Sequence, residues 1–423
     1  MISHSQRRIF NFLRERNVSG YLSLARLLKL FTTASKQAKV LALTGPLSHF
    51  SGLPAQQYLV NRAIKYSKEQ NSPGLGVRPT VALNHCMILK PFQSVAERGV
   101  LLISFEKELE KIVANPELLR LVESRFQILF LPSWTGLFSP ALLSLAARAT
   151  QDFYVLPVQA NERELVKMLG PLAHPLPFNA ASWVNEDFYQ TPGLPRDIDC
   201  LLVANFASFK RHWLLFKALQ GLPESVSALC VGVPLGSRTR ASLEAEAVEY
   251  GVRHRVEIIE NPPQEVLREY FQRAKVFCAM SYREGSFIAV AEALVSGTPV
   301  VMFKNAHIGS KELIDERTGT LVGSIRELRK EILRLMAEDR HNEVRKVAAE
   351  RVGARANSRL LNGLLKEGAL KRGEPWTQDI EPFYSMRLSF YYYSPDAPNL
   401  FKDDYQLLKQ HGVTLKGFER GQI

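Results

Sequence analysis

Short apolar runs, typical of buried strands, alternate along the chain with stretches of helical periodicity. The runs lie at 40–45, 80–83, 100–104, 128–131 and 153–158, and again at 200–204, 227–232, 256–260, 276–280 and 299–303. Helical patterns occupy 55–66, 106–114, 139–148, 264–274 and 324–352. Strands that alternate with helices predict doubly wound parallel sheets, which is an α/β fold.

The length of the chain, 423 residues, exceeds what one hydrophobic core usually serves. A proline- and glycine-containing stretch near residue 195 interrupts the alternation and is typical of a linker. We therefore expect an N-terminal domain over residues 39–195 and a C-terminal domain over 196–370. A basic helical extension, residues 1–38, precedes them, and an aromatic-rich segment, residues 371–423, follows.

The stretch 281–301, together with the apolar run 276–280 that leads into it, predicts a strand, a loop, a helix and a second strand in succession. Gly285 and Ser286 supply the turn, and the helical pattern starts at Phe287 and Ile288. The unpaired N–H groups and the positive dipole end at a helix start favour a bound phosphate. This loop is therefore a candidate phosphate site.

Two glutamates flank the start of that helix. Glu284 lies in the loop, and Glu292 lies about two turns into the helix. A carboxylate accepts hydrogen bonds from two neighbouring hydroxyl groups, so a sugar or a ribose is a natural partner. Two glutamates at this spacing also occur by chance on solvated helices, so the spacing alone decides little.

Lys210 and Arg211 follow the first strand of the C-terminal domain and precede a helix. Ligands of doubly wound sheets bind at the carboxyl ends of the strands, where these two cations can meet a diphosphate. The alternative is a basic helix start exposed to solvent. Cations at a helix N-terminus are unfavourable unless an anion joins them, which favours the diphosphate.

Together, Glu284-x7-Glu292 and the segment 306–322, which ends in Gly319-x-Leu-Val322, resemble the retaining GT-B glycosyltransferases of the "group 1" family. The resemblance implies two Rossmann-like domains facing a cleft. A nucleotide-diphosphate sugar is bound mainly by the second domain, and a glycan or lipid-linked glycan acceptor by the first. It further implies sugar transfer with retained anomeric configuration, no metal, no cofactor besides the donor substrate, and a C-terminal segment that packs back on the N-terminal domain.

The resemblance also assigns roles in the site. Lys210 contacts the donor phosphates, with Arg211 beside it, and Glu284 contacts the donor sugar. Glu292 binds the ribose, and Asn261 lies in the segment that meets the base. The loop residues at the phosphates are Gly285, Ser286, Phe287 and Ile288.

Three positions depart from the family pattern. Leu53 stands where a second glycine is customary, Asn205 where an arginine is, and Phe287 where many members have glycine. These departures keep open an alternative function, namely a catalytically silent GT-B-like protein that binds a nucleotide sugar or a glycan.

Histidines and aspartates offer further candidates. His49 lies in the first loop, and His85 and His174 lie near strand ends, so each is a candidate acceptor or acid–base contact, with a structural histidine as the alternative. Asp197 and Asp199 form an Asp-x-Asp that precedes its strand, whereas a metal-binding pair follows one. We therefore expect no metal site there.

Charge changes the picture only for partners and location. The formal charge of +12 favours polyanions. No nucleic-acid-binding signature is present, so nucleic acid is not an expected partner. The cysteines are scattered and the basic start lacks an apolar signal region, so a cytoplasmic protein with free thiols is expected. An apolar stripe at 24–31 beside Arg26 and Lys29 predicts either a docked helix or peripheral contact with an anionic membrane.

Overall fold

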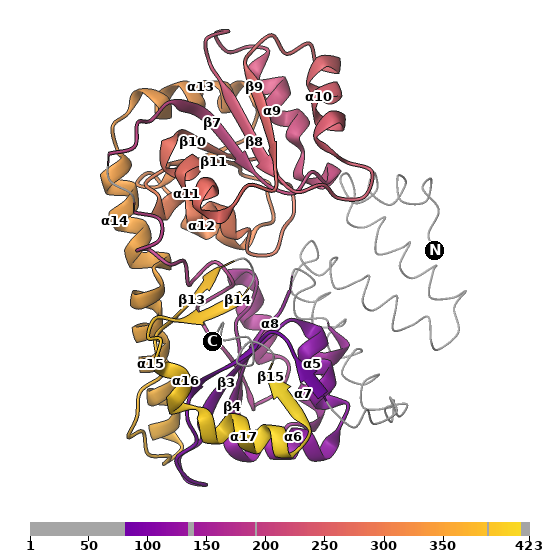
Figure 1. Ribbon diagram of the computed structural model, residues 1–423, viewed down its shortest axis with the longest axis vertical. Helices are drawn as coiled ribbons and strands as arrows, with labels where there is room; N and C mark the ends of the chain where they lie inside the picture. Colours follow the sequence, from indigo (N-terminus) through magenta and orange to yellow (C-terminus); the bar gives the residue numbers. More distant parts are fainter. Residues whose placement is uncertain (1–80, 134–138, 191–192, 387–388, 416–423) are drawn as a thin grey trace, which may run out of the picture. The chain divides into compact units, whose positions relative to one another are not determined.

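The computed structural model describes residues 81–415, with gaps at 134–138, 191–192 and 387–388 (Figure 1). The chain divides into two compact units. The described part of the first comprises residues 81–177 and 398–415, and the second comprises residues 178–397. The predictions for the basic segment 1–38, the strand at 40–45, the helix at 55–66, His49 and Leu53 fall outside the described residues.

The first unit contains a five-stranded sheet of order β2-β3-β4-β5-β6. Its strands are β2 (Cys86–Lys90), β3 (Gly99–Ser104), β4 (Phe126–Leu131), β5 (Phe153–Val155) and β6 (Ala173–Pro175). β3 to β6 pair in parallel, and β2 pairs antiparallel with β3. The connecting helices are α5 (Glu106–Val113), α6 (Pro116–Arg125), α7 (Pro140–Arg148) and α8 (Arg163–Lys167), with a 3-10 turn η2 at Ala160–Glu162.

Local side chains cap the starts of α6 and α7 in this unit. Asn115 Oδ1 accepts hydrogen bonds from the N–H groups of Glu117 and Leu118 at the start of α6, at 3.0 and 3.1 Å. Ser139 Oγ accepts from Leu142 N at 3.2 Å and so begins α7. Such caps fix where a helix begins, because they satisfy N–H groups that have no partner within the helix.

The C-terminal residues complete the first unit. β1 (Val81–Leu83) pairs in parallel with β15 (Val413–Leu415). Before β15 lie the short α16 (Ala397–Leu400) and α17 (Lys402–Gln410), and Asp404 of α17 accepts a hydrogen bond from Phe92 N at 3.1 Å. Backbone pairing and this buried carboxyl group hold residues 398–415 against the N-terminal part of the chain.

The second unit contains a six-stranded parallel sheet of order β12-β11-β10-β7-β8-β9. Its strands are β7 (Ile198–Val203), β8 (Ala228–Gly232), β9 (Val256–Glu260), β10 (Ala274–Ala279), β11 (Val300–Phe303) and β12 (Gly319–Val322). The chain builds β7, β8 and β9 outward and then returns to place β10 on the other side of β7. The strand order therefore reverses between β7 and β10, and ligands of such sheets bind at this switch point.

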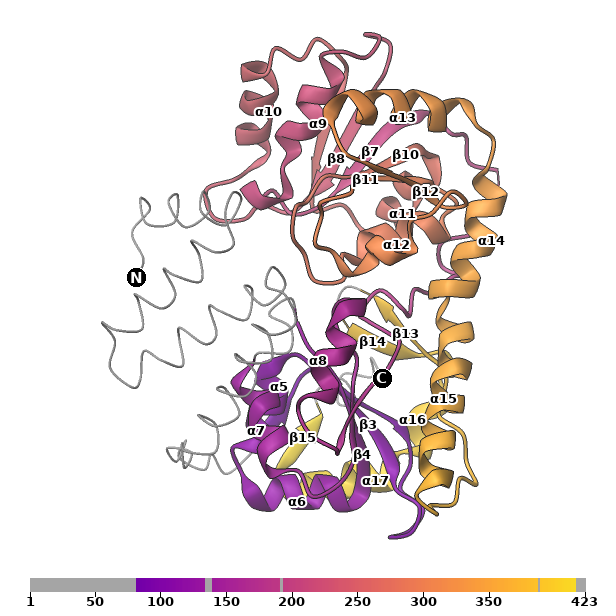
Figure 2. The same cartoon turned by 180° about the vertical axis from the view of Figure 1, so that it is seen from behind.

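Helices cover both faces of this sheet (Figure 2). α11 (Gln264–Arg273), α12 (Ile288–Val295) and α14 (His341–Val352) contribute to one core cluster. α9 (His212–Leu219), α10 (Arg240–Glu249) and α13 (Ile325–Ala337) contribute to the other. The unit ends with α15 (Ala354–Lys371) and a hairpin of β13 (Phe383–Met386) and β14 (Ser389–Tyr392).

The single long helix predicted to about residue 352 is wrong. Ser324 begins it as expected, since its Oγ accepts from Glu327 N at 3.2 Å, but α13 ends at Ala337. Glu338 has an extended backbone, and its carboxylate instead receives Arg334 at one oxygen and Arg340 at the other. A new helix, α14, starts at His341, so charged side chains at the break replace the continuing helical hydrogen bonds.

The four cysteines, Cys86, Cys200, Cys230 and Cys278, are buried free thiols, as the sequence predicted. In the part of the chain that the structure describes, no helix is long and apolar enough to cross a membrane.

Candidate functional site

Two charged side chains meet at the switch point of the second unit. Lys210 lies in the 3-10 turn η3 (Ser208–Lys210) after β7, and Glu284 lies in the loop after β10. Lys210 Nζ forms an ion pair with Glu284 Oε1, and the two side chains are only 9% and 12% exposed. Ser281 Oγ donates a hydrogen bond to the same carboxylate oxygen at 2.7 Å. The sequence placed each residue at a strand end, and the strand order brings them together.

Aromatic rings surround the Lys210 ammonium group. Its Nζ lies 4.8 Å from the centroid of the Phe287 ring and 5.4 Å from that of Phe209. The negative face of an aromatic ring attracts a cation at such distances. Phe287, which departs from the family pattern, therefore helps to hold the Lys210 ammonium group in place.

Arg211 also lies at the switch point, but its side chain turns toward β10. Its Nε donates to the carbonyl oxygen of Met280 at 2.7 Å, and its guanidinium lies 5.3 Å from the centroid of the Tyr282 ring. Asn205, where the family has arginine, accepts a hydrogen bond from Ala207 N at 3.3 Å and shapes the loop after β7. Arg211, which directly precedes α9, thus adds a second positive charge next to Lys210 in the chain.

The backbone is strained at three loops that follow strands of this sheet. Arg211, Asn261 and Phe287 are the non-glycine residues of the second unit's described part with positive φ, at 56°, 49° and 50°. Such conformations cost free energy and gather at binding and catalytic sites. Phe287 precedes α12, whose first N–H groups, at Ile288 and Ala289, have no acceptor within the helix. Asn261 N donates to Gly232 O at 2.9 Å, which ties the loops after β9 and β8 together.

The loop 281–287 is held by the segment 306–310. Backbone N–H groups of His307, Gly309 and Ser310 donate to the carbonyl oxygens of Tyr282, Gly285 and Ser286 at 2.7, 2.9 and 3.1 Å. Ser286 Oγ accepts from Ala180 N at 3.0 Å. The loop therefore keeps its shape before any ligand arrives, which lowers the entropic cost of binding.

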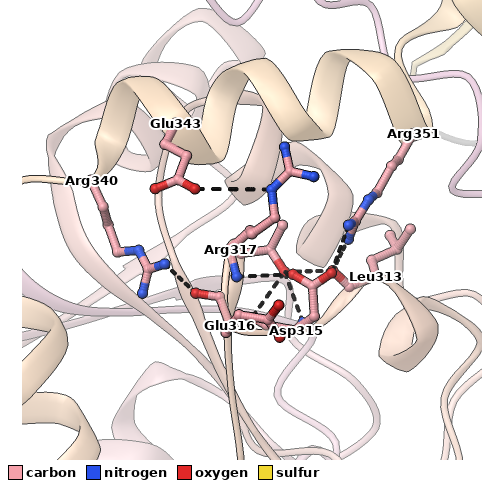
Figure 3. A network of polar contacts seen from close by, with 8 residues as sticks. Leu313, Asp315, Glu316, Arg317, Arg340, Glu343 and Arg351 are labelled. Carbon is pink, nitrogen blue, oxygen red and sulfur yellow. Dashed lines mark hydrogen bonds and ion pairs between the residues drawn. The ribbon is translucent and has the colours of Figure 1, made fainter.

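An ionic network holds the segment that follows residues 306–310 in the chain (Figure 3). Arg351 of α14 donates to Asp315 Oδ2 at 2.6 Å, and Arg317 lies 3.9 Å from Glu343 of the same helix. Arg340 bonds the carbonyl oxygen of Glu316. These contacts tie the segment between η4 (Gly309–Leu313) and β12 to α14 and to Arg340, which precedes it.

Glu292 lies inside α12 and belongs to a hydrogen-bonded chain. Tyr189 Oη donates to Glu292 Oε1 at 2.7 Å, and Gln264 Nε2 donates to Tyr189 Oη at 3.1 Å. Burial raises the pKa of Glu292, and the hydrogen bond from Tyr189 opposes that rise. Sequence reasoning missed Tyr189 and Gln264, because nothing local marks a contact across 103 residues.

The two described candidate histidines lie at different ends of the first unit's sheet. His85 precedes β2, which runs antiparallel to β3, so His85 lies where β3 and β4 end. Its ring is 4.9 Å from that of Phe105, a residue with φ of 71°. His174 Nε2 instead bonds Asp152 Oδ1 at 2.5 Å, and Asp152 precedes β5. His174 thus bonds Asp152 near the amino ends of the strands, away from the edge at which ligands of such sheets bind.

Asp197 and Asp199 also lie at the amino end of their sheet, at the start of β7. Asp197 is bound by Arg273 at 2.8 and 2.7 Å, which lowers the pKa of Asp197. Burial acts to raise the pKa of Asp199, but hydrogen bonds from Lys275 and Ser227 lower it. Both carboxylates are engaged by protein groups, at the end of the strand opposite to Lys210.

The sheet order and the paired charges at its switch point define a candidate ligand site of a doubly wound α/β domain. Residues 186–352 match the family model of glycosyl transferases group 1. Two curated relatives are D-inositol 3-phosphate glycosyltransferases. The protein of Xylanimonas cellulosilytica is 35% identical over 136 residues, which is 31% of this chain and 31% of the relative. That of Mycobacteroides abscessus is 34% identical over 124 residues, 28% of this chain and 27% of the relative.

The fold has a solved counterpart in HepE from Anabaena, whose structure was determined in complex with UDP. The TM-score is 0.50 at 16% identity, over 73% of this chain and 82% of that one. The chain thus has the α/β architecture of GT-B glycosyltransferases, with the parallel sheets that the sequence predicted. Within it, residues 186–352 are similar to group 1 glycosyltransferase domains.

Proposed function

We propose that the protein transfers a sugar from a nucleotide-diphosphate donor to an acceptor. The observation that carries this proposal is the Lys210–Glu284 ion pair at the switch point, next to the start of α12, within the matched region. A cation and free helical N–H groups are the groups that a departing diphosphate needs. Glu284 adds an acceptor for the hydroxyl groups of the donor sugar.

The ion pair is compatible with donor binding, because an ammonium group has three donors. Lys210 can keep its bond to Glu284 and donate to a phosphate oxygen at the same time. Ser281 and Lys210 both bond Oε1 of Glu284, and no described residue bonds Oε2. In this scheme Oε2 of Glu284 accepts hydrogen bonds from the sugar hydroxyls. Glu292 binds the ribose, and the loop at Asn261 contacts the base.

Negative charge develops on the leaving diphosphate in the transition state. Lys210, the N–H groups of Ile288 and Ala289 and the nearby Arg211 would stabilise that charge without a metal ion. We further propose retention of the anomeric configuration, as the resemblance implies. For the acceptor we propose a glycan or lipid-linked glycan, with contacts from the first unit, where His85 lies at the ligand-binding edge of the sheet. The names of the two relatives make inositol phosphates worth testing as acceptors.

A screen of UDP, GDP, ADP and their sugar conjugates tests the proposal. A ligand that binds only the native state raises its melting temperature. We expect one nucleoside diphosphate to raise the melting temperature. We also expect the protein to hydrolyse the corresponding nucleotide sugar slowly, at the same rate with and without EDTA. No shift with any of them would overturn the donor site, and a strict requirement for Mg²⁺ or Mn²⁺ would overturn the metal-free scheme.

A second function is favoured by Asn205 and Phe287, which replace residues usual in the family. A protein with these changes that binds a nucleotide sugar without turning it over would serve as a sensor or scaffold. The same screen separates the two functions: tight nucleotide-sugar binding, with no hydrolysis and no transfer to a panel of glycan acceptors, supports the silent protein.

A further inference from the structure

Three segments distant in sequence converge on the carboxyl group of Glu292. Tyr189 lies before β7, Gln264 is the first residue of α11, and Glu292 lies in α12. The bonds run from Gln264 Nε2 to Tyr189 Oη at 3.1 Å and from Tyr189 Oη to Glu292 Oε1 at 2.7 Å. Tyr189 is 3% exposed and Gln264 is 6% exposed, whereas Glu292 is only partly buried.

We propose that Tyr189 is a positioning residue for donor recognition, which holds Glu292 so that its second oxygen accepts hydrogen bonds from the ribose hydroxyls. The inference rests on the proposed function, since it needs a nucleotide at this site. It adds a specific claim, that selection of ribose depends on the phenol hydroxyl of Tyr189 as well as on Glu292.

The direction of the hydrogen bonds supports this claim. A phenol has one proton to donate and also accepts. Because the Gln264 amide donates into the phenol oxygen, the phenol proton is directed to Glu292 Oε1. No described residue bonds Oε2 of Glu292, so that oxygen stays open to a ligand hydroxyl.

The rings around Tyr189 explain how the carboxyl group is kept in one orientation. The terminal torsion of a glutamate side chain is broad, so a carboxylate rotates easily unless it is bonded. The Tyr189 ring packs edge-on against Phe188 and Phe271, with centroids 5.2 and 6.0 Å apart. A rigid phenol therefore fixes a carboxylate that is otherwise free to turn.

The chain also reaches the loop proposed for the base. Gln264 lies three residues after Asn261, whose strained backbone begins the loop that follows β9. Burial raises the pKa of Glu292, and the Tyr189 bond favours its ionised form, which is the better acceptor for hydroxyl groups. The hydrogen bonds that start at Glu292 thus end at the residue that directly follows the loop proposed for the base.

Calorimetric titration of the full chain tests the inference. The probes are whichever of UDP, GDP and ADP binds the wild type most tightly and its 2′,3′-dideoxy counterpart, which lacks both hydroxyls. We expect Tyr189→Phe, which keeps the ring, to weaken binding of the ribonucleotide about tenfold and that of the dideoxy nucleotide by less than about threefold, as loss of a charge-assisted hydrogen bond implies. Gln264→Ala should show the same pattern with a smaller loss.

Tyr270→Phe is the matched control, because it removes a hydroxyl from another tyrosine of the same unit that makes no hydrogen bond with a described residue. It should leave both affinities unchanged. Equal losses for both nucleotides in Tyr189→Phe and Gln264→Ala would mean a merely structural role and overturn the inference. The inference would also be overturned if Tyr189→Phe and Gln264→Ala bound both nucleotides as tightly as the wild type, while Glu292→Gln lost its preference for the ribonucleotide. A wild type that binds no nucleotide would overturn the proposed donor site together with the inference.

Discussion

Helices that start at the carboxyl ends of the two sheets differ in their first turns: α5 of the first unit differs from α9 and α12 of the second. In the first unit, Glu106 and Glu108 of the first turn of α5 accept hydrogen bonds from the N–H groups of Ser133 and Asn84, at 2.8 and 3.0 Å. In the second unit, α9 and α12 begin without an acidic residue in the first turn and without a side-chain cap. Carboxylates thus already occupy the first turn of α5, whereas the first turns of α9 and α12 carry none.

The residues around the starts of α9 and α12 add to the difference. Arg211 and Phe287 precede α9 and α12 in left-handed conformations, and neither offers a capping oxygen. The first residue of α9, His212, is fully buried, and burial lowers its pKa to about 3, so its imidazole is neutral. The positive dipole ends are left for an incoming anion. In the proposed scheme, the open helix start beside a buried cation receives the donor diphosphate, whereas a start with carboxylates in its first turn, such as that of α5, suits a neutral, hydroxyl-bearing ligand.

The largest effect is expected from Lys210→Ala. Removing one group that stabilises developing negative charge lowers turnover by about 10² to 10³-fold. Hydrolysis of the nucleotide sugar that the wild type prefers measures the loss. Lys217→Ala on the exposed side of α9 is the control and should be neutral. Equal rates in the two variants would remove Lys210 from the site.

Glu284→Gln probes the other half of the ion pair. Removal of the partner leaves a largely buried cation unpaired, which should lower the free energy of unfolding by about 3 kcal/mol. A nucleoside diphosphate brings its own negative charge, so the ligand should recover more stability in this variant than in the wild type. Urea unfolding with and without the ligand measures both. A variant as stable as the wild type would show that the pair contributes nothing.

Ala289→Glu makes the start of α12 resemble that of α5. The new carboxylate should satisfy the helix dipole and repel a diphosphate, weakening nucleotide affinity about tenfold. Ala289→Gln, of the same size but neutral, should lose much less. If both variants bind alike, size rather than charge decides, and the contrast between the two sheets has no electrostatic basis.

The smallest effect concerns a buried carboxyl group in the first unit. Burial raises the pKa of Asp404 from 3.8 to about 6, so the folded state prefers the protonated form. Relative to an uncharged side chain, stability is therefore full below pH 4 and declines as pH rises through 6. Asp404→Asn should raise the unfolding free energy by about 1 to 2 kcal/mol at pH 8 and change it little at pH 4. A gain independent of pH would contradict this reading.

The sequence predicted the strands and the loops that carry charge, because apolar runs and strand-end positions are local signals. It placed Lys210 and Glu284 correctly at strand ends, but their contact depends on β10 lying beside β7, which no local pattern encodes. The same limit hid Tyr189 from the prediction for Glu292. The break of the helix at Glu338 was missed because its residues, all charged, neither forbid a helix nor contain glycine or proline.

The most direct test of the donor site is a crystal structure of the full chain soaked with the nucleoside diphosphate that gives the largest thermal shift. We expect density for the diphosphate at the start of α12, within hydrogen-bond distance of Lys210 Nζ and of the N–H groups of Ile288 and Ala289. Glu292 Oε2 should accept from the ribose. A diphosphate bound elsewhere, such as beside His85, with Lys210 still contacting only Glu284, would contradict it.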